Sequence, residues 1–300
     1  MKAIKIAIAI ISLLTFYSCE KEIPLKIDNV EEKVVLNSLV YSDSIMHVSL
    51  STSSIIGSGR KTAPIANAQV KLFANGTFQE ELQERYSGIY LSEQPLMANT
   101  NYQVDVVSEK GNVSATTSIP DTTENVTIES AKAINMILDS FYGSEQVYKV
   151  SVSFIDPPAD SYYLMRVKAF DTTNNHHYFP GSMFYFDVDY MSTSSEIGSE
   201  TFIYTYPYLR LPDDDLTTGK NTFTFGFRPN NYNNSNEYYL EFYALNEDFY
   251  SYITSLELYE TVQYDFFAEP MNVFSNIDGG LGVFAGASCI KVDFPEMQYE

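Results

Sequence analysis

The sequence predicts a mostly β protein with two β-sandwich-like domains, and three observations lead to this fold class. From Val34 onward, apolar and polar residues alternate with period two, as they do in half-buried antiparallel strands. Turn-forming pairs such as Asn75-Gly76 and Ser87-Gly88 separate the alternating runs at short intervals. Of the 24 tyrosines and 20 phenylalanines, only eight lie in residues 1–140. This shift in composition predicts two units, with the boundary at the proline-containing stretch near residue 120.

The first unit, residues 33–120, has the strand and turn spacing of an immunoglobulin-like or prealbumin-like sandwich. Asn75-Gly76 suits a tight type I′ hairpin, because both residues tolerate a positive φ. The second unit, residues 121–300, is the aromatic-rich β domain. Its expected strands are 147–154, 162–170, 184–188, 202–206, 222–227 and 238–244.

One principal helix is expected at 247–259 within the second unit. Asn246 can cap it, and Glu247 and Asp248 complement the positive end of its dipole. Its apolar positions fall on one face, and they are Phe249, Tyr252, Ile253, Leu256 and Tyr259. We expect this helix to seal an open edge or end of the second sandwich.

Residues 1–18 are expected to be a signal peptide rather than part of the fold. Lys2 and Lys5 precede a short apolar run over 6–14, which is too short to span a membrane. Ser18-Cys19 resembles the bacterial lipobox, in which the cysteine is acylated after cleavage; an ordinary secretory signal is the alternative. Residues 19–32 then form a tether. Its Glu20, Lys21 and Glu22 resemble the charged export signal of Bacteroidota surface lipoproteins, although they also suit a merely solvated tether.

Composition excludes several classes of function. A net charge of -21 repels phosphate backbones and argues against nucleic acid as a partner. The sequence contains no Gly-x-Ser-x-Gly elbow, no phosphate-binding loop of the Gly-x-x-x-x-Gly-Lys type and no His-Glu-x-x-His. We therefore expect no enzyme activity and no cofactor, and a hydrolase of unknown type is the remote alternative.

Individual reactive residues give only weak signals. His176 and His177 are expected to be exposed in a loop after Asn175, with a transition-metal site as the alternative. Cys289 lies among apolar residues, and a buried core position is expected. Asp187 and Asp189 are weak calcium candidates, since they would share one face of a regular strand.

Residues 280–285 fit the Gly-x-Gly-x-x-Ala pattern of dinucleotide-binding proteins. That pattern must open a helix within a βαβ unit, and this context is missing. Gly280 and Gly282 are instead expected at a tight bend with close backbone packing.

The C-terminal segment carries a resemblance to a known family. Asn246–Tyr252, Phe266–Pro270 and Val273–Ile277 are followed by Gly279–Gly286, all behind the lipoprotein-type leader and the Ala66–Val70 segment. This order resembles the Bacteroidota lipoproteins called domain of unknown function 4249 over essentially the whole mature chain. The resemblance implies a TonB-dependent outer-membrane receptor as a neighbour, with no established substrate and no catalytic residues.

The resulting expectation is a non-enzymatic, lipid-anchored outer-membrane protein that faces the cell exterior. It would assist the receptor by capturing a nutrient or covering the receptor's mouth. A structural or adhesive surface protein is the alternative. Aromatic side chains in polar loops are the candidate contacts with ligand or partner, and they are Tyr178, Phe179, Tyr190, Tyr206, Tyr208 and Tyr232.

Overall fold

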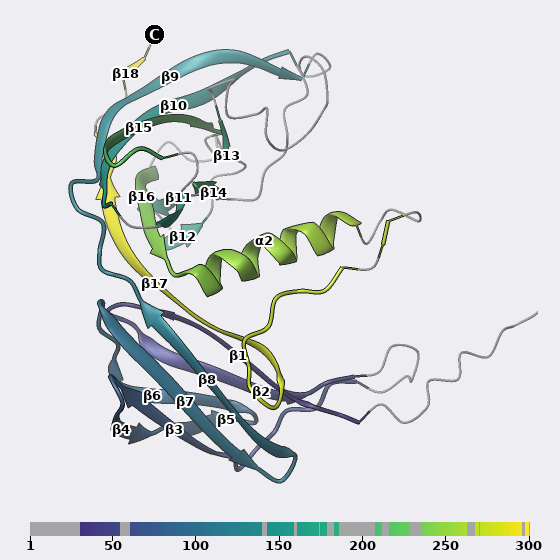
Figure 1. The fold of residues 1–300 in the computed structure, drawn as a ribbon. Helices are drawn as coiled ribbons and strands as arrows, with labels where there is room; N and C mark the ends of the chain where they lie inside the picture. Colours follow the sequence, from purple (N-terminus) through teal and green to yellow (C-terminus); the bar gives the residue numbers. More distant parts are fainter. Residues whose placement is uncertain are drawn as a thin grey trace, which may run out of the picture. The chain divides into compact units, whose positions relative to one another are not determined.

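A nine-stranded sheet runs through the protein in a computed structural model of the chain (Figure 1). Its strands are neighbours in the order β12 (His176–Tyr178), β11 (Tyr162–Asp171), β16 (Asn236–Leu245), β17 (Leu281–Asp293), β1 (Val34–Tyr41), β2 (Ile45–Thr52), β6 (Ile89–Pro95) and β5 (Gln83–Tyr86). The ninth strand, β14 (Leu209–Leu211), pairs with β11.

The structure describes residues 31–54, 61–139, 143–158, 161–173, 175–178, 183–185, 208–211, 216–228, 236–262, 268–269, 271–295 and 298–299. The described residues from 33 onward belong to one compact unit. Cys19, Glu20, Lys21 and Glu22 lie outside the described residues. Among the described helices, none is long and apolar enough to cross a membrane.

A four-stranded sheet covers one half of the nine-stranded sheet. Its order is β4 (Thr77–Glu81), β3 (Gln69–Ala74), β7 (Thr100–Ser108) and β8 (Gly111–Ile119). Alternate residues of both sheets, such as Leu36, Val48, Val70 and Val104, are buried between them. We call this buried cluster the N-terminal core. Its formation follows from the period-two pattern, because each strand presents one apolar face.

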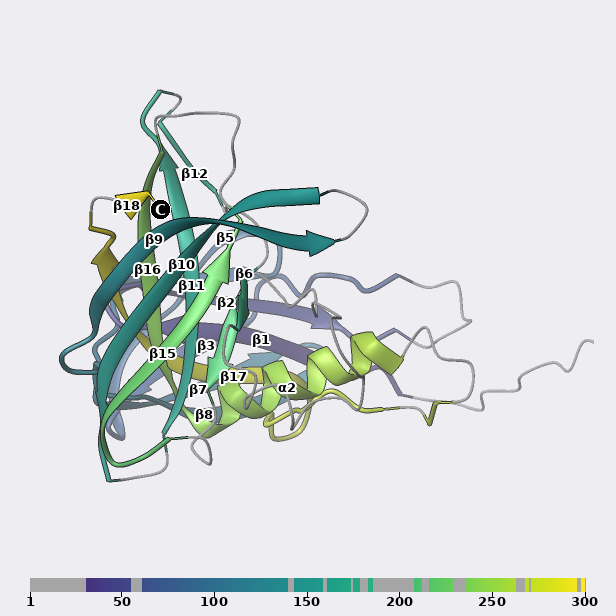
Figure 2. The same ribbon diagram turned by 90° about the horizontal axis from the view of Figure 1, so that it is seen from above.

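A five-stranded sheet covers the other half in the same way. Its order is β13 (Met183–Tyr185), β15 (Gly219–Phe227), β10 (Gly143–Asp156), β9 (Thr127–Asp139) and β18 (Gln298–Tyr299), and Figure 2 shows β9, β10 and β15 side by side. Phe154, Tyr163 and Phe242 meet at ring centroid distances of 4.8 to 5.3 Å in the C-terminal core between the sheets. The aromatic half of the sequence therefore builds this second sandwich.

Strand β17 belongs to both sandwiches. It pairs parallel with β1 and antiparallel with β16. Phe284 packs in the N-terminal core, whereas Ile290 and Val292 pack against the C-terminal core. The last long strand of the chain thus joins the first strand to the aromatic half, and the backbone ladder is continuous across both halves.

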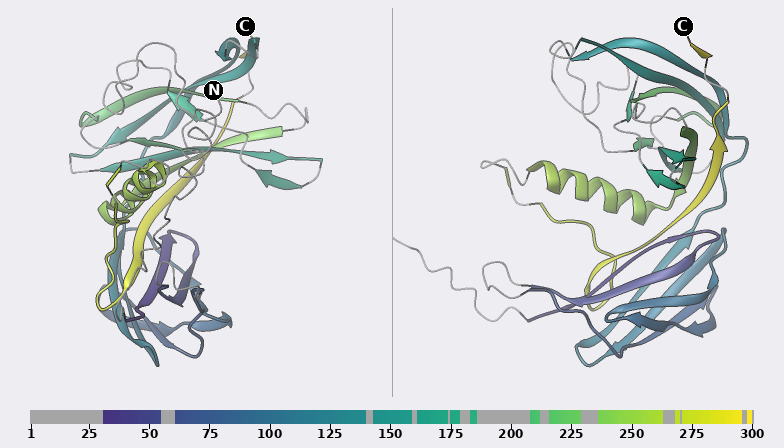
Figure 3. Two further views of the ribbon diagram at one scale, coloured as in Figure 1. Left: turned by 90° about the vertical axis from the view of Figure 1, so that its right-hand side faces the viewer. Right: turned by 180° about the vertical axis from the view of Figure 1, so that it is seen from behind.

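Helix α2 (Glu247–Val262) lies along β17 in both views of Figure 3. It packs on a face of the nine-stranded sheet, where Phe249 and Ile253 meet Val283 and Ala285 of β17. The helix predicted at 247–259 is confirmed. The expectation that it seals an edge or end was wrong, because its partners are β17 and β16, which are central strands of that sheet.

The mostly β fold with sandwich-like halves is confirmed, as is the Asn75-Gly76 hairpin, where both residues have positive φ. His176 and His177 were expected in a loop, but they lie in β12 and pair with β11.

The expected strands 147–154, 162–170, 222–227 and 238–244 fall within β10, β11, β15 and β16. The expected strand 202–206 and most of 184–188 lie outside the described residues. Strands β9, β12, β14, β17 and β18 were not predicted from the sequence.

We call residues 279–286 the glycine segment. It leads into β17 rather than into a helix, so its glycines serve close strand packing and not dinucleotide binding. A Cβ on Gly280 would meet the backbone oxygen of Val34 at 2.6 Å, and one on Gly282 would meet that of Leu36 at 2.0 Å. Asn276 completes the bend, because its side-chain amide bonds both the N–H and the C=O of Phe284 at 2.9 and 2.8 Å. Glycine is needed here because β17 enters close to the backbone of β1.

Candidate functional site

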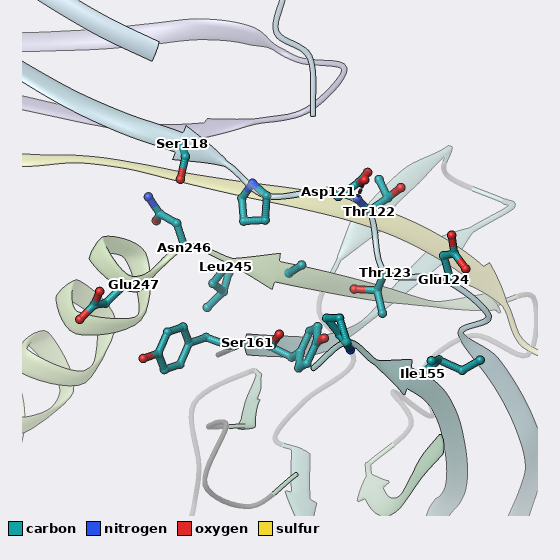
Figure 4. Close-up of a pocket in the computed structure, with 15 residues that line it drawn as sticks. Ser118, Asp121, Thr122, Thr123, Glu124, Ile155, Ser161, Leu245, Asn246 and Glu247 are labelled. Carbon is teal, nitrogen blue, oxygen red and sulfur yellow. Dashed lines mark hydrogen bonds between the residues drawn. The ribbon is translucent and has the colours of Figure 1, made fainter. Parts of the chain in front are cut away.

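A hollow, which we call the junction cavity, lies where the chain passes from the first sandwich to the second (Figure 4). Strand β8 ends at Ile119 and β9 begins at Thr127, and the segment between them forms one wall. The ends of β10 and β16, the start of β11 and the first turn of α2 supply the others. The cavity has a volume of about 560 Å³, within the usual range for small-molecule sites. It is lined by Ser118, Pro120, Asp121, Thr122, Thr123, Glu124, Ile155, Pro157, Ser161, Tyr162, Tyr163, Ala244, Leu245, Asn246 and Glu247.

The inner part of the junction cavity includes buried apolar residues, and its two tyrosines are held in place by neighbouring side chains. Ala244, Leu245 and Tyr163 are buried. The Tyr163 hydroxyl donates a hydrogen bond to the buried carboxylate of Asp156 at 2.9 Å. Tyr162 is held by stacking on Tyr250 of α2, with a centroid distance of 4.6 Å. These contacts fix both tyrosines at the start of β11 before anything binds.

The rim of the junction cavity is acidic. Asp121, Glu124 and Glu247 are exposed, and Figure 4 shows Asp121 and Glu124 on one side with Glu247 on the other. None of the described residues that line the cavity is Lys, Arg or His. The site is therefore rich in hydrogen-bond acceptors and negative charge, and it offers no group that would neutralise an anion.

A second hollow, of about 510 Å³, adjoins the first. It is lined by Gly76, Asn101, Tyr102, Gln103, Thr116, Thr117, Ser118, Asn246, Glu247 and Asp248. Ser118, Asn246 and Glu247 line both hollows, so the two are neighbours at the beginning of α2. We call them together the junction groove.

Asn246 is the residue that holds the junction groove in shape. Its Oδ1 accepts the N–H of Phe249, which caps α2, and the N–H of Gly286 in β17, at 3.0 and 3.2 Å. Its Nδ2 donates to the Thr117 hydroxyl in β8 at 2.8 Å. One side chain thus ties the helix, the shared strand and the first sandwich together. The sequence predicted the cap, but nothing local indicated the other two bonds.

A second polar cluster lies on the sheet face that α2 partly covers. The Arg166 Nε donates to Glu241 Oε2 at 2.5 Å, and its guanidinium also donates to the Tyr243 hydroxyl. Tyr243 in turn donates to Glu241 at 2.7 Å, and Lys168 lies 3.3 Å from the other carboxylate oxygen. Burial alone would raise the pKa of Glu241, but the bonds from Tyr243 and Arg166 hold it below its ordinary value. These four side chains are neighbours on β11 and β16, so their bonds tie the two strands together.

Cys289 lies beside that cluster, directly opposite Tyr243 in the ladder. It is half-buried rather than fully buried as expected, and it packs against the residues under α2. Burial, together with the negative charge of Glu241, raises the pKa of its thiol to about 11. The thiol is therefore protonated at neutral pH and is a poor nucleophile.

The predicted contact residues are only partly within the described structure. Tyr208 is half-buried, and its hydroxyl donates to Glu257 of α2 at 2.9 Å, beside the ion pair of Glu257 with Arg210. Tyr178 lies in β12, but its side chain is outside the described part. Also outside it are Phe179, Tyr190, Tyr206 and Tyr232, as well as the calcium candidates Asp187 and Asp189.

The histidines do not assemble a metal site with other residues that the structure describes. In that part of the chain, no three His, Cys, Asp or Glu side chains are grouped to hold a metal ion. His177 instead lies against Phe170 and places its Nδ1 3.2 Å from the Tyr239 hydroxyl. Its observed role is packing at the edge of the nine-stranded sheet.

Comparison with known proteins gives a family but no relative of known function. No curated protein matches the chain. A family model described as a domain of unknown function (DUF4249) matches residues 20–290, which include the glycine segment, α2 and both sandwiches. The chain belongs to this DUF4249 family.

Proposed function

We propose that this chain is a non-enzymatic, lipid-anchored protein of the outer membrane, displayed outward as the accessory of a TonB-dependent receptor. The observation that carries the proposal is the leader: Lys2, Lys5 and a short apolar run end at Ser18-Cys19, followed by a charged stretch. Acylation of Cys19 would anchor the chain through its tether. The expected tether, residues 19–32, would join this anchor to the unit formed by residues 33–300.

The described structure supports a binding role more than a catalytic one. The junction cavity brings tyrosines, carboxylates and hydroxyls together, which suits the binding of a polar ligand. Cys289 keeps its proton at neutral pH, and Glu241 is engaged by Arg166 and Tyr243. Such a molecule would capture a nutrient or cover the receptor's mouth. A structural or adhesive surface protein is the alternative that the test must separate.

The anchor is tested with the two cysteines, which serve as a matched pair. Cys19→Ser should remove the lipid and release the protein from the membrane fraction, because no acyl chain then holds it. Cys289→Ser should leave both the lipid mass and the fractionation unchanged. A Cys19→Ser protein that stays in the outer membrane, with no lipid mass on the wild type, would refute the anchor.

Outward display is tested separately by replacing Glu20, Lys21 and Glu22 with alanine. If these residues direct export, external protease should digest the variant less than the wild type in intact cells. Equal digestion of both proteins would count against an export role for the three residues.

The receptor partnership is tested by affinity purification from native membranes in mild detergent. A TonB-dependent barrel should co-purify with the lipoprotein at moderate salt. Tyr190→Ala, Tyr206→Ala and Tyr232→Ala are the informative substitutions, while Tyr208 should be kept because it anchors α2 through Glu257. Recovery of the lipoprotein alone, under conditions that express the receptor, would favour the structural alternative.

A further inference from the structure

We propose that the junction groove is a binding site for an organic cation, with a di- or polyamine as the ligand class. This inference goes beyond the proposed function and does not depend on the anchor or on the receptor. It rests on the charge of the groove, one buried polar atom and the apolar inner wall.

The first argument is charge. Asp121, Glu124, Glu247 and Asp248 line the groove, and no Lys, Arg or His does so among its described lining residues. Opposite charge is attracted from solution and like charge is excluded, so an anionic ligand is disfavoured. The N-terminus of α2 opposes this preference, but Asn246 already accepts the N–H of Phe249, and Glu247 and Asp248 place negative charge at its positive end.

The carboxylates at the start of α2 also lack full compensation. Asp248 is partly buried, and its pKa is raised by desolvation and by the neighbouring charge of Glu247, although a hydrogen bond from Asn276 opposes this. A cation placed beside these two acids would relieve their repulsion. That relief adds to the binding free energy without any change in the fold.

The second argument is the Thr123 hydroxyl. Its oxygen is buried on the wall of the junction cavity and has no hydrogen-bond partner among the described residues. Figure 4 shows this oxygen turned toward the middle of the lining side chains. Leaving a buried hydroxyl without a partner is unfavourable, and a donor from a ligand would remove that penalty. An ammonium group has three donors and no acceptor, so it suits both this oxygen and the rim carboxylates.

The third argument is the shape of the ligand. Ala244, Leu245 and Tyr163 offer a buried apolar surface beneath the acidic rim. An alkyl chain fits that surface while its terminal ammonium groups stay near Asp121, Glu124 and Glu247. A ligand with charges at both ends of a flexible chain matches a groove whose acids stand on opposite sides (Figure 4).

The test is calorimetric titration of the purified full chain in mild detergent, at moderate salt of about 0.15 M to suppress surface attraction. Hexanediamine and spermidine are the cationic probes, and adipate is the anionic control of similar length. We expect both amines to bind and adipate not to bind. Amines that fail to bind, or adipate that binds as well as hexanediamine, would overturn the proposal.

Two matched triple variants locate the site. Asp121→Asn, Glu124→Gln and Glu247→Gln together should weaken amine binding by at least about tenfold. Glu109→Gln, Glu237→Gln and Glu269→Gln make the same change in net charge at exposed positions away from the groove and should alter it by less than about twofold. Equal loss in both variants would mean attraction to the acidic surface as a whole.

Thr123→Val separates a binding effect from a folding effect. Because the hydroxyl is unpartnered, its removal should leave the thermal midpoint of the free protein unchanged or higher, yet weaken amine binding. Unchanged binding would remove the hydroxyl from the site. Cys19→Ser should bind amines like the wild type, so failure of the anchor and failure of this site are distinguishable.

Discussion

At the scale of single residues, the fold depends on positions where two backbones come unusually close. Gly282 has φ of +112°, and its missing side chain leaves room for the backbone oxygen of Leu36. Gly219 has a similar φ of +105°, with open space where a Cβ would be. Substitutions at these two glycines therefore distinguish the loss of stability caused by an unfavourable φ from the loss caused by a steric clash.

Gly219→Ala should lower the free energy of unfolding by about 1–2 kcal/mol, the usual cost of a positive φ. Gly282→Ala should cost clearly more, because β17 must also move away from β1. Urea denaturation of both variants measures the difference. Equal losses would mean that the close approach at Gly282 has no energetic consequence.

Asn246 acts at the same scale through three hydrogen bonds. Asn246→Ala removes the helix cap together with the bonds to Gly286 and Thr117, and we expect a loss of about 2–3 kcal/mol. Asn246→Ser keeps a capping oxygen and should recover about 1 kcal/mol of this in urea denaturation. If Asn246→Ser loses as much unfolding free energy as Asn246→Ala, the helix cap contributes little to the stability that Asn246 provides.

At the scale of elements, charged pairs fix how the strands and α2 fit together. Arg210 of β14 binds Glu257 of α2 through two nitrogens, at 2.5 and 3.1 Å, and donates to Thr254. Arg166 of β11 binds Glu241 of β16, directly opposite in the ladder. Glu241 is the more deeply buried of these acids, with a side chain that is only 4% exposed. Its ionisation should therefore influence stability.

The pKa of Glu241 is lower in the folded protein than its ordinary value of 4.5. Its ionised form thus stabilises the fold above that pH, and this contribution is lost as pH falls through the lowered folded-state pKa. Glu241→Gln should flatten the dependence of unfolding free energy on pH between about pH 5 and pH 3.

Arg166→Met provides the check on that prediction, because it removes the main basic partner. It should flatten the dependence of unfolding free energy on pH over the same range. Combining it with Glu241→Gln should change that dependence little further. Additive effects on the slope would show that Arg166 does not influence the ionisation of Glu241.

At the scale of the whole molecule, β17 makes the two sandwiches depend on each other. It supplies Phe284 to the N-terminal core and Ile290 and Val292 to the packing of the C-terminal core. It is also the backbone partner of β1, which would otherwise be an open edge of its sheet. The described structure therefore predicts that residues 33–120 lack an essential strand when they are isolated.

Expressed alone, residues 33–120 should show no cooperative unfolding transition in a circular-dichroism melt. Addition of a peptide of residues 276–293 should restore one, because it replaces β17 and the Asn276 bend. In the full chain, Leu36→Ala and Phe154→Ala should shift the same single transition. A cooperative melt of residues 33–120 without the peptide would contradict this dependence.

Local pattern in the sequence determined the class of fold, strands β10, β11, β15 and β16 of the second sandwich, the Asn75-Gly76 hairpin and the helix after Asn246. Alternation, turn chemistry and capping act between residues a few positions apart, so they can be recognised from the sequence alone. The order of segments at the C-terminus also sufficed for the family. The anchor at Cys19 remains a prediction from the leader sequence alone.

Only the tertiary structure decided that β17 lies beside β1, that Glu241 meets Arg166 and Tyr243, and that a groove opens around Asn246. Each of these joins segments far apart in the sequence, and no local pattern encodes which strands become neighbours. The glycines at 280 and 282 carried a signal, but it specified only close approach and not its partner. The physical reason is that strand order is set by how whole apolar faces are buried together, a property of the complete chain rather than of any segment.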